Sequence, residues 1–432
     1  MTGGNAGQKS VIIVGAGPGG LTAAMILAHR GFKVTVIEKR GQIGGRNGEL
    51  KVDGYSHDIG PTFLMMKFLL DSIFEITGRS SDDYMDFRLL DPMYELVHQD
   101  FSFLPSTDPV KMRKEIGRVF PGEEQGFDRF MERERVRFEK MYPCLQKPYS
   151  DISAYFAPVF LKALPHLALT KSLYQVLAGY YVPEELRISF TFQSKYLGMS
   201  PWSCPGAFSI IPYIEYGHGV YHVQGGLCRI SDGMARAVEE EGGEILLDTP
   251  VKRVIVENRV AKGVELEDGT KLMADDVIIN ADFAHAMSTL ADPADLKKYT
   301  DQDLRQRGYS CSTYMLYLGL DKLYDTQHHT IVFAEDYQKN LDEIANQKVL
   351  SEDISFYVRN SSVTDPLVAP EGHSSVYVLV PVPNNKSGID WEQENSSFRE
   401  QVLTAIEDRT QMTDLRQHIG ADHPPGPLGT RS

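Results

Sequence analysis

Three glycines and one acid near the amino terminus have the residue types and the spacing needed to hold a diphosphate. Gly15, Gly17 and Gly20 form a G-x-G-x-x-G pattern, and Glu38 follows 18 residues after the last of them. The first glycine permits a tight turn, the second leaves the backbone open to a pyrophosphate, and the third lets a helix pack closely on a strand. Glu38 can accept hydrogen bonds from an adenosine ribose. The pattern predicts a dinucleotide-binding site.

The same stretch of sequence also predicts the strands and the helix that position these residues. Residues 11–14 are typical of a buried strand, residues 18–30 of a helix and residues 34–37 of a second strand. The free N–H groups and the positive dipole end of the helix would face the phosphates. Although residues 11–28 carry no charge, their glycines and the lack of a basic leading segment argue against a signal peptide or a membrane span.

A second glycine-rich loop directly after the acid favours FAD over a nicotinamide cofactor. Gly44 and Gly45 precede Arg46, whose guanidinium can fork onto phosphate oxygens of a longer ligand. The chain then runs to D-I-G-P-T at residues 58–62 instead of continuing directly into another helix and strand. A surface loop with an exposed arginine is the alternative interpretation of this segment.

Composition limits the classes of function. With 432 residues the chain is long enough for two domains, and a net charge of −15 makes a nucleic-acid partner unexpected. The four cysteines form no C-x-x-C pair, and the twelve histidines show no H-E-x-x-H spacing, so we expect no metal and no disulfide framework. The adjacent His328 and His329 are expected to be a solvated pair.

The order of the segments predicts domains that are discontinuous in sequence. An α/β pattern over residues 10–85 gives way to a helical insertion and returns at about 215, with a helix at 227–241 and short strands up to residue 280. We therefore expect a cofactor domain of residues 10–85 and 215–295. The substrate domain then takes residues 86–214 and 296–418, where strand-like runs alternate with polar helices, and residues 419–432 form an unstructured Pro/Gly-rich tail.

Residues 153–183 are apolar on most faces, and two interpretations stay open. Pro158 and Pro165 would break the segment into short helices, so a single transmembrane helix is not expected. One interpretation is a buried core hairpin. The other is an apolar lip that enters one leaflet of a membrane and admits a lipid-soluble substrate.

Several motifs in order give the chain a recognisable resemblance. G-A-G-P-G-G-L-T-A-A, G-Q-I-G-G-R and D-I-G-P-T are followed by Y-H-V-Q-G-G-L-C-R-I-S-D-G-M at 221–234 and T-P-V-K-R-V at 249–254. Together they resemble the bacterial-type phytoene desaturases and their diapophytoene relatives, over residues 10–418. This resemblance implies an α/β fold class, a Rossmann-like FAD-binding domain of the GR2 type with an inserted α+β substrate domain. The residues that it places along FAD are Gly15, Gly17, Pro18, Gly19, Gly20, Glu38, Lys39, Gly45, Arg46, Gly60, Pro61, Thr62 and Val251.

The implied reaction is desaturation of a long polyene hydrocarbon in carotenoid biosynthesis. Such a substrate has no hydrogen-bonding group, so the cofactor supplies the hydride acceptor and the protein supplies a dry, oriented channel. We expect quinone or oxygen as the electron acceptor, and a cytoplasmic enzyme that associates peripherally with the membrane. No catalytic residue is assigned; Arg187, Gln193 and Lys195 would either stand near the flavin or mark a solvated helix face.

Three alternatives remain open from the sequence. The first is a related carotenoid isomerase or saturase, and the second is a flavin amine oxidase of the same fold. The third is an inactive remnant, because the resemblance leads us to expect a closing strand and helix beyond residue 418 that the Pro/Gly-rich end does not match.

Overall fold

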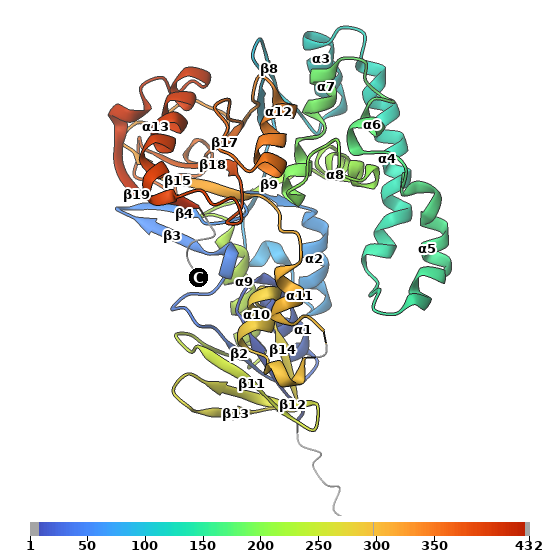
Figure 1. Ribbon diagram of the computed structural model, residues 1–432, viewed down its shortest axis with the longest axis vertical. Helices are drawn as coiled ribbons and strands as arrows, with labels where there is room; N and C mark the ends of the chain where they lie inside the picture. The colour runs from blue at the N-terminus through green and yellow to red at the C-terminus, as the bar shows by residue number, and fades with distance from the viewer. Residues whose placement is uncertain (1–7, 297, 428–432) are drawn as a thin grey trace, which may run out of the picture. The chain divides into compact units, whose positions relative to one another are not determined.

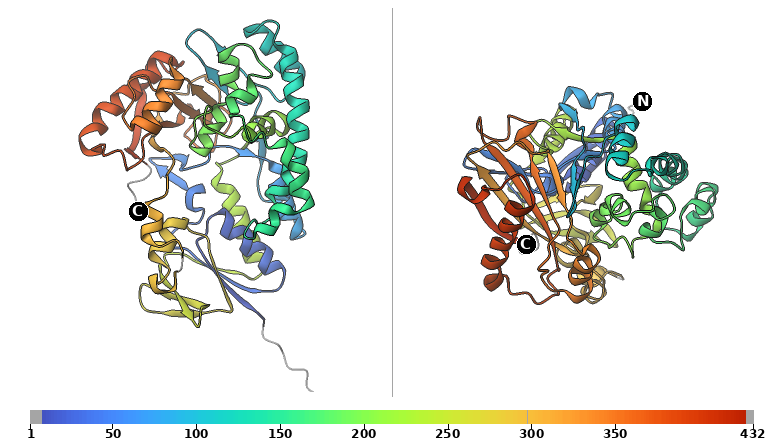
Figure 2. Two further views of the ribbon diagram at one scale, coloured as in Figure 1. Left: turned by 45° about the vertical axis from the view of Figure 1, so that its right-hand side comes forward. Right: turned by 90° about the horizontal axis from the view of Figure 1, so that it is seen from above.

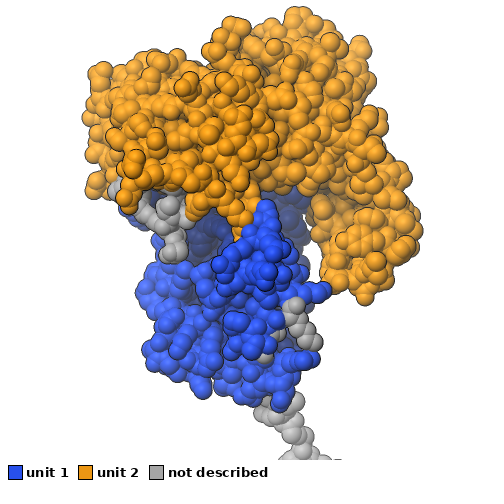
Figure 3. All heavy atoms as spheres, in the orientation of Figure 1, with its two compact units in different colours: residues 1–51, 56–88, 221–308 blue, residues 52–55, 89–220, 309–432 orange. Residues whose placement is uncertain are grey.

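The computed structural model describes residues 8–296 and 298–427, which fall into two compact units. Unit 1 takes its described residues from segments 1–51, 56–88 and 221–308. Unit 2 takes them from segments 52–55, 89–220 and 309–432. Figure 3 shows the two units in different colours. Each unit is therefore assembled from pieces that are far apart in the sequence.

A four-stranded parallel sheet organises unit 1, with the strand order β10-β2-β1-β14, and Figure 1 labels β2 and β14 of this sheet. Strands rich in Val and Ile are expected where both faces of a parallel sheet are covered. Ile13, Val36 and Leu21 are almost fully buried in the core of this unit. The strands are β1 (Ser10–Val14), β2 (Lys33–Ile37), β10 (Glu244–Leu246) and β14 (Asp276–Ile279).

The longer helices of unit 1 each follow a strand after a short turn. Helix α1 (Pro18–His29) starts with proline in its first turn, where a missing N–H removes no helical hydrogen bond. Its residues Leu21 and Met25 share one core with Ile230 and Met234 of α9 (Cys228–Glu240). The other helices are α2 (Lys67–Ile76), η2 (Ser81–Asp83), α10 (Phe283–Thr289), η7 (Pro293–Asp295) and α11 (Asp301–Arg305).

Three smaller sheets are also present. A meander of β11 (Val251–Glu257), β12 (Val260–Leu266) and β13 (Lys271–Met273) follows β10. The chain also forms a two-stranded sheet and a three-stranded sheet of order β5-β9-β6. Their strands are β3 (Glu49–Val52), β4 (Tyr55–Asp58), β5 (Leu64–Met65), β6 (Phe87–Leu89) and β9 (Val220–Val223).

A seven-stranded mixed sheet is the centre of unit 2, in the order β19-β15-β18-β17-β16-β7-β8. All neighbours are antiparallel except β16 and β7. Helix α13 (Trp391–Arg409) covers one face of this sheet through Phe398, Val402 and Ile406 (Figure 2). The strands are β7 (Glu95–Val97), β8 (Ser102–Phe103), β15 (Ser312–Leu320), β16 (His329–Val332), β17 (Phe356–Asn360), β18 (Ser374–Val382) and β19 (Ile419–Pro427).

The rest of unit 2 is mostly helical. The longest helix, α4 (Glu124–Leu145), is amphipathic and buries Phe127, Phe130 and Phe138. The other helices are α3 (Pro109–Val119), α5 (Pro158–Ala163), α6 (Leu173–Leu177), α7 (Glu184–Ser189), α8 (Ile210–His218) and α12 (Tyr337–Asp342). Single turns are η3 (Ile152–Phe156), η4 (Leu164–His166), η5 (Phe192–Leu197), η6 (Gly206–Ser209), η8 (Glu343–Gln347), η9 (Ser361–Val363) and η10 (Leu415–His418).

Two sequence-based expectations about segments are wrong. The expected unstructured tail is instead strand β19 over Ile419–Pro427, because an edge strand pairs on one side only and so tolerates prolines that donate no hydrogen bond. Residues 52–55 and 215–220 were expected in the cofactor domain but belong to unit 2, and residues 296–308 were expected in the substrate domain but belong to unit 1. There Tyr299 packs edge-on against Phe283 of α10, with ring centroids 4.9 Å apart.

Candidate functional site

The glycine turn between β1 and α1 is shaped mainly by contacts within the protein. Gly15 has φ +104°, a conformation that side chains rarely adopt, and its N–H donates to Ile37 O at 2.8 Å. A Cβ on Gly20 would lie 2.2 Å from Gly15 O, and one on Gly19 would lie 2.8 Å from Asn280 Oδ1. Gly15 and Gly20 therefore need glycine for the turn and the helix to pack, whereas at Gly19 only the end of the Asn280 side chain would have to move.

Gly17 differs from its neighbours because a Cβ there would be crowded by only one side-chain atom. A Cβ on Gly17 would meet only the Asn280 side-chain amide at 3.3 Å and Gly44 O at 3.9 Å. Gly17 is also the N-cap of α1, and the first helical hydrogen bond to it comes from Leu21 N–H. The amide groups in the first turn of α1 are thus outside the helical hydrogen-bond ladder and suited to an anion.

Glu38 ends β2 beside this turn and is 6% exposed. Its Oε2 accepts a hydrogen bond from Ala16 N–H at 2.9 Å, and its Oε1 accepts one from Arg40 N–H at 3.1 Å. Each carboxylate oxygen keeps a second lone pair for another donor. The acid is therefore held rigidly next to the turn and still able to accept hydrogen bonds from a ligand.

The second glycine loop packs directly on the first. Gly44 N–H donates to Ala16 O at 2.8 Å, and a Cβ on Gly45 would lie 3.5 Å from Gly17 Cα. A Cβ on Gly60 would lie 2.2 Å from Arg46 O, so the 58–62 loop in turn lies on the backbone of the second loop. The three predicted loops thus form one stacked layer, which we call the glycine layer: residues 15–20, 44–47 and 58–62.

Asn47 and Asp58 fasten the glycine layer to α9. The buried Asn47 Nδ2 donates to Leu227 O at 2.8 Å and to Ser231 Oγ at 3.0 Å. Asp58 Oδ1 accepts a hydrogen bond from Cys228 N–H at 3.2 Å. The Gln224–Gly226 block, singled out by its motif, sits here because Gly226 has φ +101° and a Cβ on it would lie 3.0 Å from Asp58 Oδ1.

The remaining predicted residues lie around this layer with different exposure. Lys39 and Pro61 are exposed, Thr62 is buried, and Val251 opens β11 shortly after Thr249 N–H donates to Glu38 O at 2.9 Å. Arg46 is 86% exposed and forms an ion pair with Asp282 at 2.8 Å. An exposed pair of this kind contributes at most about 1 kcal/mol, so the guanidinium is free to exchange partners.

Asn280 is a functional candidate that the sequence reasoning did not single out. Its side-chain amide donates to Gly15 O at 3.2 Å, and the same amide lies against the Cβ positions of Gly17, Gly19 and Gly20. It follows β14 directly, so the parallel pairing of β14 with β1 brings it to the turn. Its position in the V-I-I-N-A-D run at residues 277–282, at the end of a predicted strand, is the sequence feature that could have pointed to it.

The donor set of the glycine layer fits a dinucleotide. It offers helix-end amides for a diphosphate, a buried carboxylate for a ribose and an exposed arginine. These groups come from segments around residues 17, 38 and 46, all within unit 1.

In unit 2 the predicted residues 187, 193 and 195 do not form a solvated face. Gln193 is fully buried, and its Nε2 donates to Glu215 at 2.7 Å. Lys195 Nζ donates to Ser355 Oγ at 2.8 Å and lies 4.7 Å from the centre of the Tyr337 ring. Burial lowers the pKa of Lys195 to about 7. Arg187 donates to Tyr181 O at 2.8 Å.

Glu215 is a buried acid that no sequence motif predicted. Its side chain is fully enclosed, and it accepts hydrogen bonds from Gln193, from Tyr94 OH at 2.9 Å and from Tyr196 OH at 3.2 Å. Burial raises the pKa of Glu215 to about 7, against the lowering effect of these donors. Its oxygens are occupied by protein donors, which indicates a structural role.

The expectation of a solvated histidine pair is wrong. His328 and His329 are 4% and 0% exposed, because β16 lies inside the seven-stranded sheet. His328 bonds Thr364, and Arg359 Nε donates to its Nε2 at 3.2 Å. His329 Nδ1 bonds Tyr357 OH at 2.7 Å.

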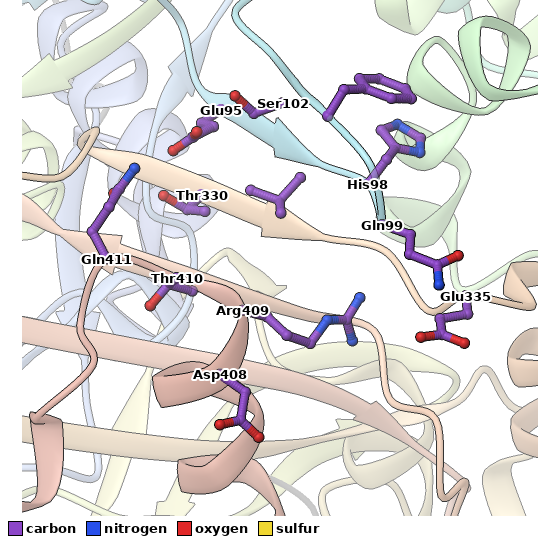
Figure 4. Close-up of a pocket in the computed structure, with 12 residues that line it drawn as sticks. Glu95, His98, Gln99, Ser102, Thr330, Glu335, Asp408, Arg409, Thr410 and Gln411 are labelled. Carbon is purple, nitrogen blue, oxygen red and sulfur yellow. The ribbon is translucent and has the colours of Figure 1, made fainter.

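A cavity of about 500 Å³ in unit 2 is unsuited to a hydrocarbon (Figure 4). It opens beside β7, β16 and the end of α13, and charged side chains such as Glu95, Glu335 and Arg409 line it. Apolar ligands need predominantly apolar walls with few polar groups. We therefore do not assign this cavity to a polyene.

Different parts of the apolar segment 153–183 fit different interpretations. Leu173, Val176 and Leu177 are buried, so the core interpretation holds for α6. It is wrong for the part before α6, where Pro158 and Pro165 start separate short turns and several large apolar side chains are exposed. We call this set the apolar lip: Ile152, Phe156, Leu161, Leu164 and Leu169. Within the described ranges, no helix has the length and apolar character to cross a bilayer.

Comparison with known proteins finds similarity over most of the chain. The family described as flavin-containing amine oxidoreductase matches residues 18–379. A 4,4'-diapophytoene desaturase (4,4'-diapolycopene-forming) from Methylomonas sp is 51% identical over 414 residues, which are 96% of this chain and 81% of the relative. An all-trans-zeta-carotene desaturase from Myxococcus xanthus is 36% identical over 95% of this chain and 79% of its own length. The predicted resemblance is thereby confirmed.

Solved structures show the same fold at low identity. Cyclohexylamine oxidase from Brevibacterium oxydans has a TM-score of 0.59 at 16% identity and covers 98% of this chain and 86% of its own. An oxidoreductase from Methanosarcina mazei has a TM-score of 0.60 at 17% identity, covering 92% and 84%. The predicted α/β class, a Rossmann-like domain with a second substrate unit, is confirmed.

Proposed function

The chain belongs to the family of flavin-containing amine oxidoreductases, and we propose that it is an FAD-dependent desaturase of a long polyene hydrocarbon. The family membership also confirms FAD as the predicted cofactor. The observation that carries the proposal is the high identity to the Methylomonas desaturase over nearly the whole chain. The proposed substrate is 4,4'-diapophytoene, and the proposed product is 4,4'-diapolycopene.

The glycine layer is the proposed binding site of FAD. The N–H groups of Gly17, Gly19 and Gly20 would face the pyrophosphate, Glu38 would accept from the adenosine ribose, and Val251 would lie toward the adenine. Arg46 would leave Asp282 for a phosphate oxygen. The other proposed contacts are Pro18, Gly19, Lys39, Gly45, Gly60, Pro61 and Thr62.

The chemistry divides between cofactor and protein. Bound FAD would supply the acceptor for a hydride from an allylic carbon, and a proton from the adjacent carbon leaves to complete each double bond. The chain's own part is to orient the hydrocarbon and to exclude water, which favours apolar walls. Quinone or oxygen is the proposed final acceptor.

The reaction is tested by expressing the chain in a bacterial host that accumulates 4,4'-diapophytoene. We expect a coloured product whose mass falls by two hydrogens per double bond formed. Purified, flavin-loaded protein that leaves the hydrocarbon unchanged would contradict the proposal. A product of unchanged mass would indicate an isomerase, a gain of hydrogen a saturase, and peroxide from added amines an amine oxidase.

The apolar lip is the proposed contact with a membrane. Ile152, Phe156 and Leu169 are 77%, 71% and 73% exposed, more than large apolar side chains in a sealed core. Full burial of one such side chain yields about 1.5–3 kcal/mol, so a few of them can hold a protein at a bilayer. A peripheral position would also give access to a substrate dissolved in the lipid.

Co-sedimentation with phosphatidylcholine vesicles tests this contact. The double variant Phe156→Ser/Leu169→Ser should bind at least about tenfold more weakly, because two apolar groups no longer enter the lipid. Leu367→Ser is the matched control, since Leu367 is also 71% exposed in unit 2 but lies outside the lip. Equal binding by wild type and double variant would rule out the lip.

A further inference from the structure

We propose that a cavity beside the apolar lip binds the phosphate of an anionic phospholipid headgroup; this rests on the proposed membrane contact. The cavity has a volume of about 570 Å³ and lies between α4 and the turns around η4 and α6. Its walls are Arg129, Glu132, Arg133, Val136, Pro165, His166, Gly179 and Tyr180. Two arginines one helical turn apart thus share one concave surface.

Arg129 and Arg133 keep their donors available for a ligand. Both side chains are exposed, and Arg129 donates only to the backbone oxygen Tyr180 O, at 3.1 Å. Within residues 8–296 and 298–427, neither guanidinium has an ion pair. A planar fork of donors without an acid partner is the group that proteins use for phosphate recognition.

Each acid of α4 near the cavity pairs with a cation other than Arg129 and Arg133, although Arg135 is shared by Glu132 and Glu139. Glu132, which lines the cavity, pairs with Arg135 at 2.9 Å, and the buried Glu134 pairs with Arg137 at 2.6 Å. Asp128 pairs with Arg113 at 2.9 Å. The positive charge of Arg129 and Arg133 is therefore not cancelled by their own helix.

The charge of this region is opposite to that of the whole chain. Residues 129–171 contain eight Lys or Arg and four Asp or Glu, whereas the chain carries a net charge of −15. An acidic protein is repelled by an anionic membrane unless a local basic surface faces it. The same segment carries the apolar lip, so insertion would bring these cations to the headgroup level.

The position of the cavity favours a lipid over a soluble phosphate. Pro165 and His166 of its wall follow Leu164 directly and precede Leu169, both members of the apolar lip. Figure 1 shows α5 alongside the end of α4, which places the lip and this helix together. A headgroup in the cavity can therefore keep its acyl chains beside the exposed leucines.

Vesicle binding with two lipid compositions tests the proposal. The variant Arg129→Gln/Arg133→Gln should bind vesicles containing phosphatidylglycerol at least about tenfold more weakly than wild type, because each basic residue near an anionic surface contributes about fivefold. Its binding to pure phosphatidylcholine should change far less. Both side chains are exposed, so the thermal midpoint should stay unchanged.

Two controls make the result decisive. Lys114→Gln/Lys348→Gln removes the same charge elsewhere in unit 2 and should retain the phosphatidylglycerol preference. An equal loss in this control, or an undiminished preference in Arg129→Gln/Arg133→Gln, would overturn the headgroup site. Tight calorimetric binding of soluble glycerol 3-phosphate by wild type would overturn the lipid source. If Phe156→Ser/Leu169→Ser loses binding to phosphatidylcholine and Arg129→Gln/Arg133→Gln does not, the proposed membrane contact is supported whatever the result for the headgroup site.

Discussion

The glycines of the first turn are required for different reasons, which only the atoms around them reveal. Gly15 needs its left-handed backbone, while Gly19 and Gly20 face protein atoms closer than a side chain tolerates. Gly17 has the roomiest surroundings of these four, with its nearest neighbour at 3.3 Å. If packing does not demand glycine there, a ligand lying on the backbone is the remaining physical reason.

The variant Gly17→Val tests that reason. A branched side chain should push the pyrophosphate away and weaken FAD retention at least about tenfold, since overpacking by a few atoms costs about 1–3 kcal/mol. The measurement is the ratio of flavin to protein absorbance after purification. Gly308→Val, where a Cβ would meet nothing within 4 Å, is the matched control in unit 1. A normal flavin content in Gly17→Val would refute the assignment.

Glu215 gives a prediction about pH. Its pKa is about 7 in the folded protein against an ordinary value of 4.5 for glutamate, so the folded state holds its proton more tightly than the unfolded state. Between these two values the unfolded chain binds fewer protons, and stability therefore falls as pH rises. The shift corresponds to a loss of about 3 kcal/mol, complete near pH 7.

The comparison of wild type with Glu215→Gln isolates this contribution. Urea unfolding at several pH values between about 4.5 and 7 should show a downward slope in wild type that is reduced in the variant. Glutamine keeps a polar group beside Gln193 without titrating. Parallel slopes for the two proteins would mean that the acid is not held protonated by burial.

At the scale of elements, Asn47 connects the second glycine loop to the start of α9. Its two hydrogen bonds to Leu227 and Ser231 are buried, so Asn47→Ala leaves acceptors without a donor and should destabilise the protein by about 1–3 kcal/mol. Thermal unfolding measures the effect. Ser231→Ala removes only the longer bond and should have a smaller effect. An unchanged midpoint in Asn47→Ala would show that the loop holds without this anchor.

Local patterns were sufficient to predict several elements of the two units. The predicted strand at 34–37 and the predicted helix after Gly17 correspond to β2 and α1 within a few residues, and the strand-like runs expected in the substrate domain include β15. Hydrophobic periodicity and the turn residues Gly and Pro act over short distances, and the sequence records them directly. The first two glycine loops are also brought together by their motifs, because they follow the neighbouring strands β1 and β2, whereas the third follows β4 of another sheet.

Features that depend on distant partners were not predictable. The histidine pair is buried only because β17 and β7 flank β16 on either side. Residues 419–427 form a strand because β15 presents a free edge, which overrides the poor strand propensity of proline. Glu215 likewise acquires its environment from Tyr94 and Gln193, which come from other elements.

At the scale of the whole molecule, the two units draw on separate cores. Ile13 and Leu21 belong to a core of unit 1, whereas Leu316 and Val378 belong to a core of unit 2. All proposed FAD contacts, from Gly15 to Val251, lie in unit 1. Bound FAD is therefore expected to stabilise unit 1 directly, although that unit is built from three separate segments.

This organisation predicts a selective response to FAD in hydrogen exchange. A ligand at 100 times its dissociation constant stabilises the state that binds it by about 2.7 kcal/mol, which slows exchange through opening of that state about a hundredfold. We expect this protection in β1 and β14, which flank the glycine turn, and a smaller change in β15 and β18. Gly17→Val should show no protection in either set. Protection by FAD confined to β15 and β18 would place the cofactor in unit 2 and contradict the proposed site. The direction of the difference thus reports where the cofactor binds, independently of whether the enzyme turns over.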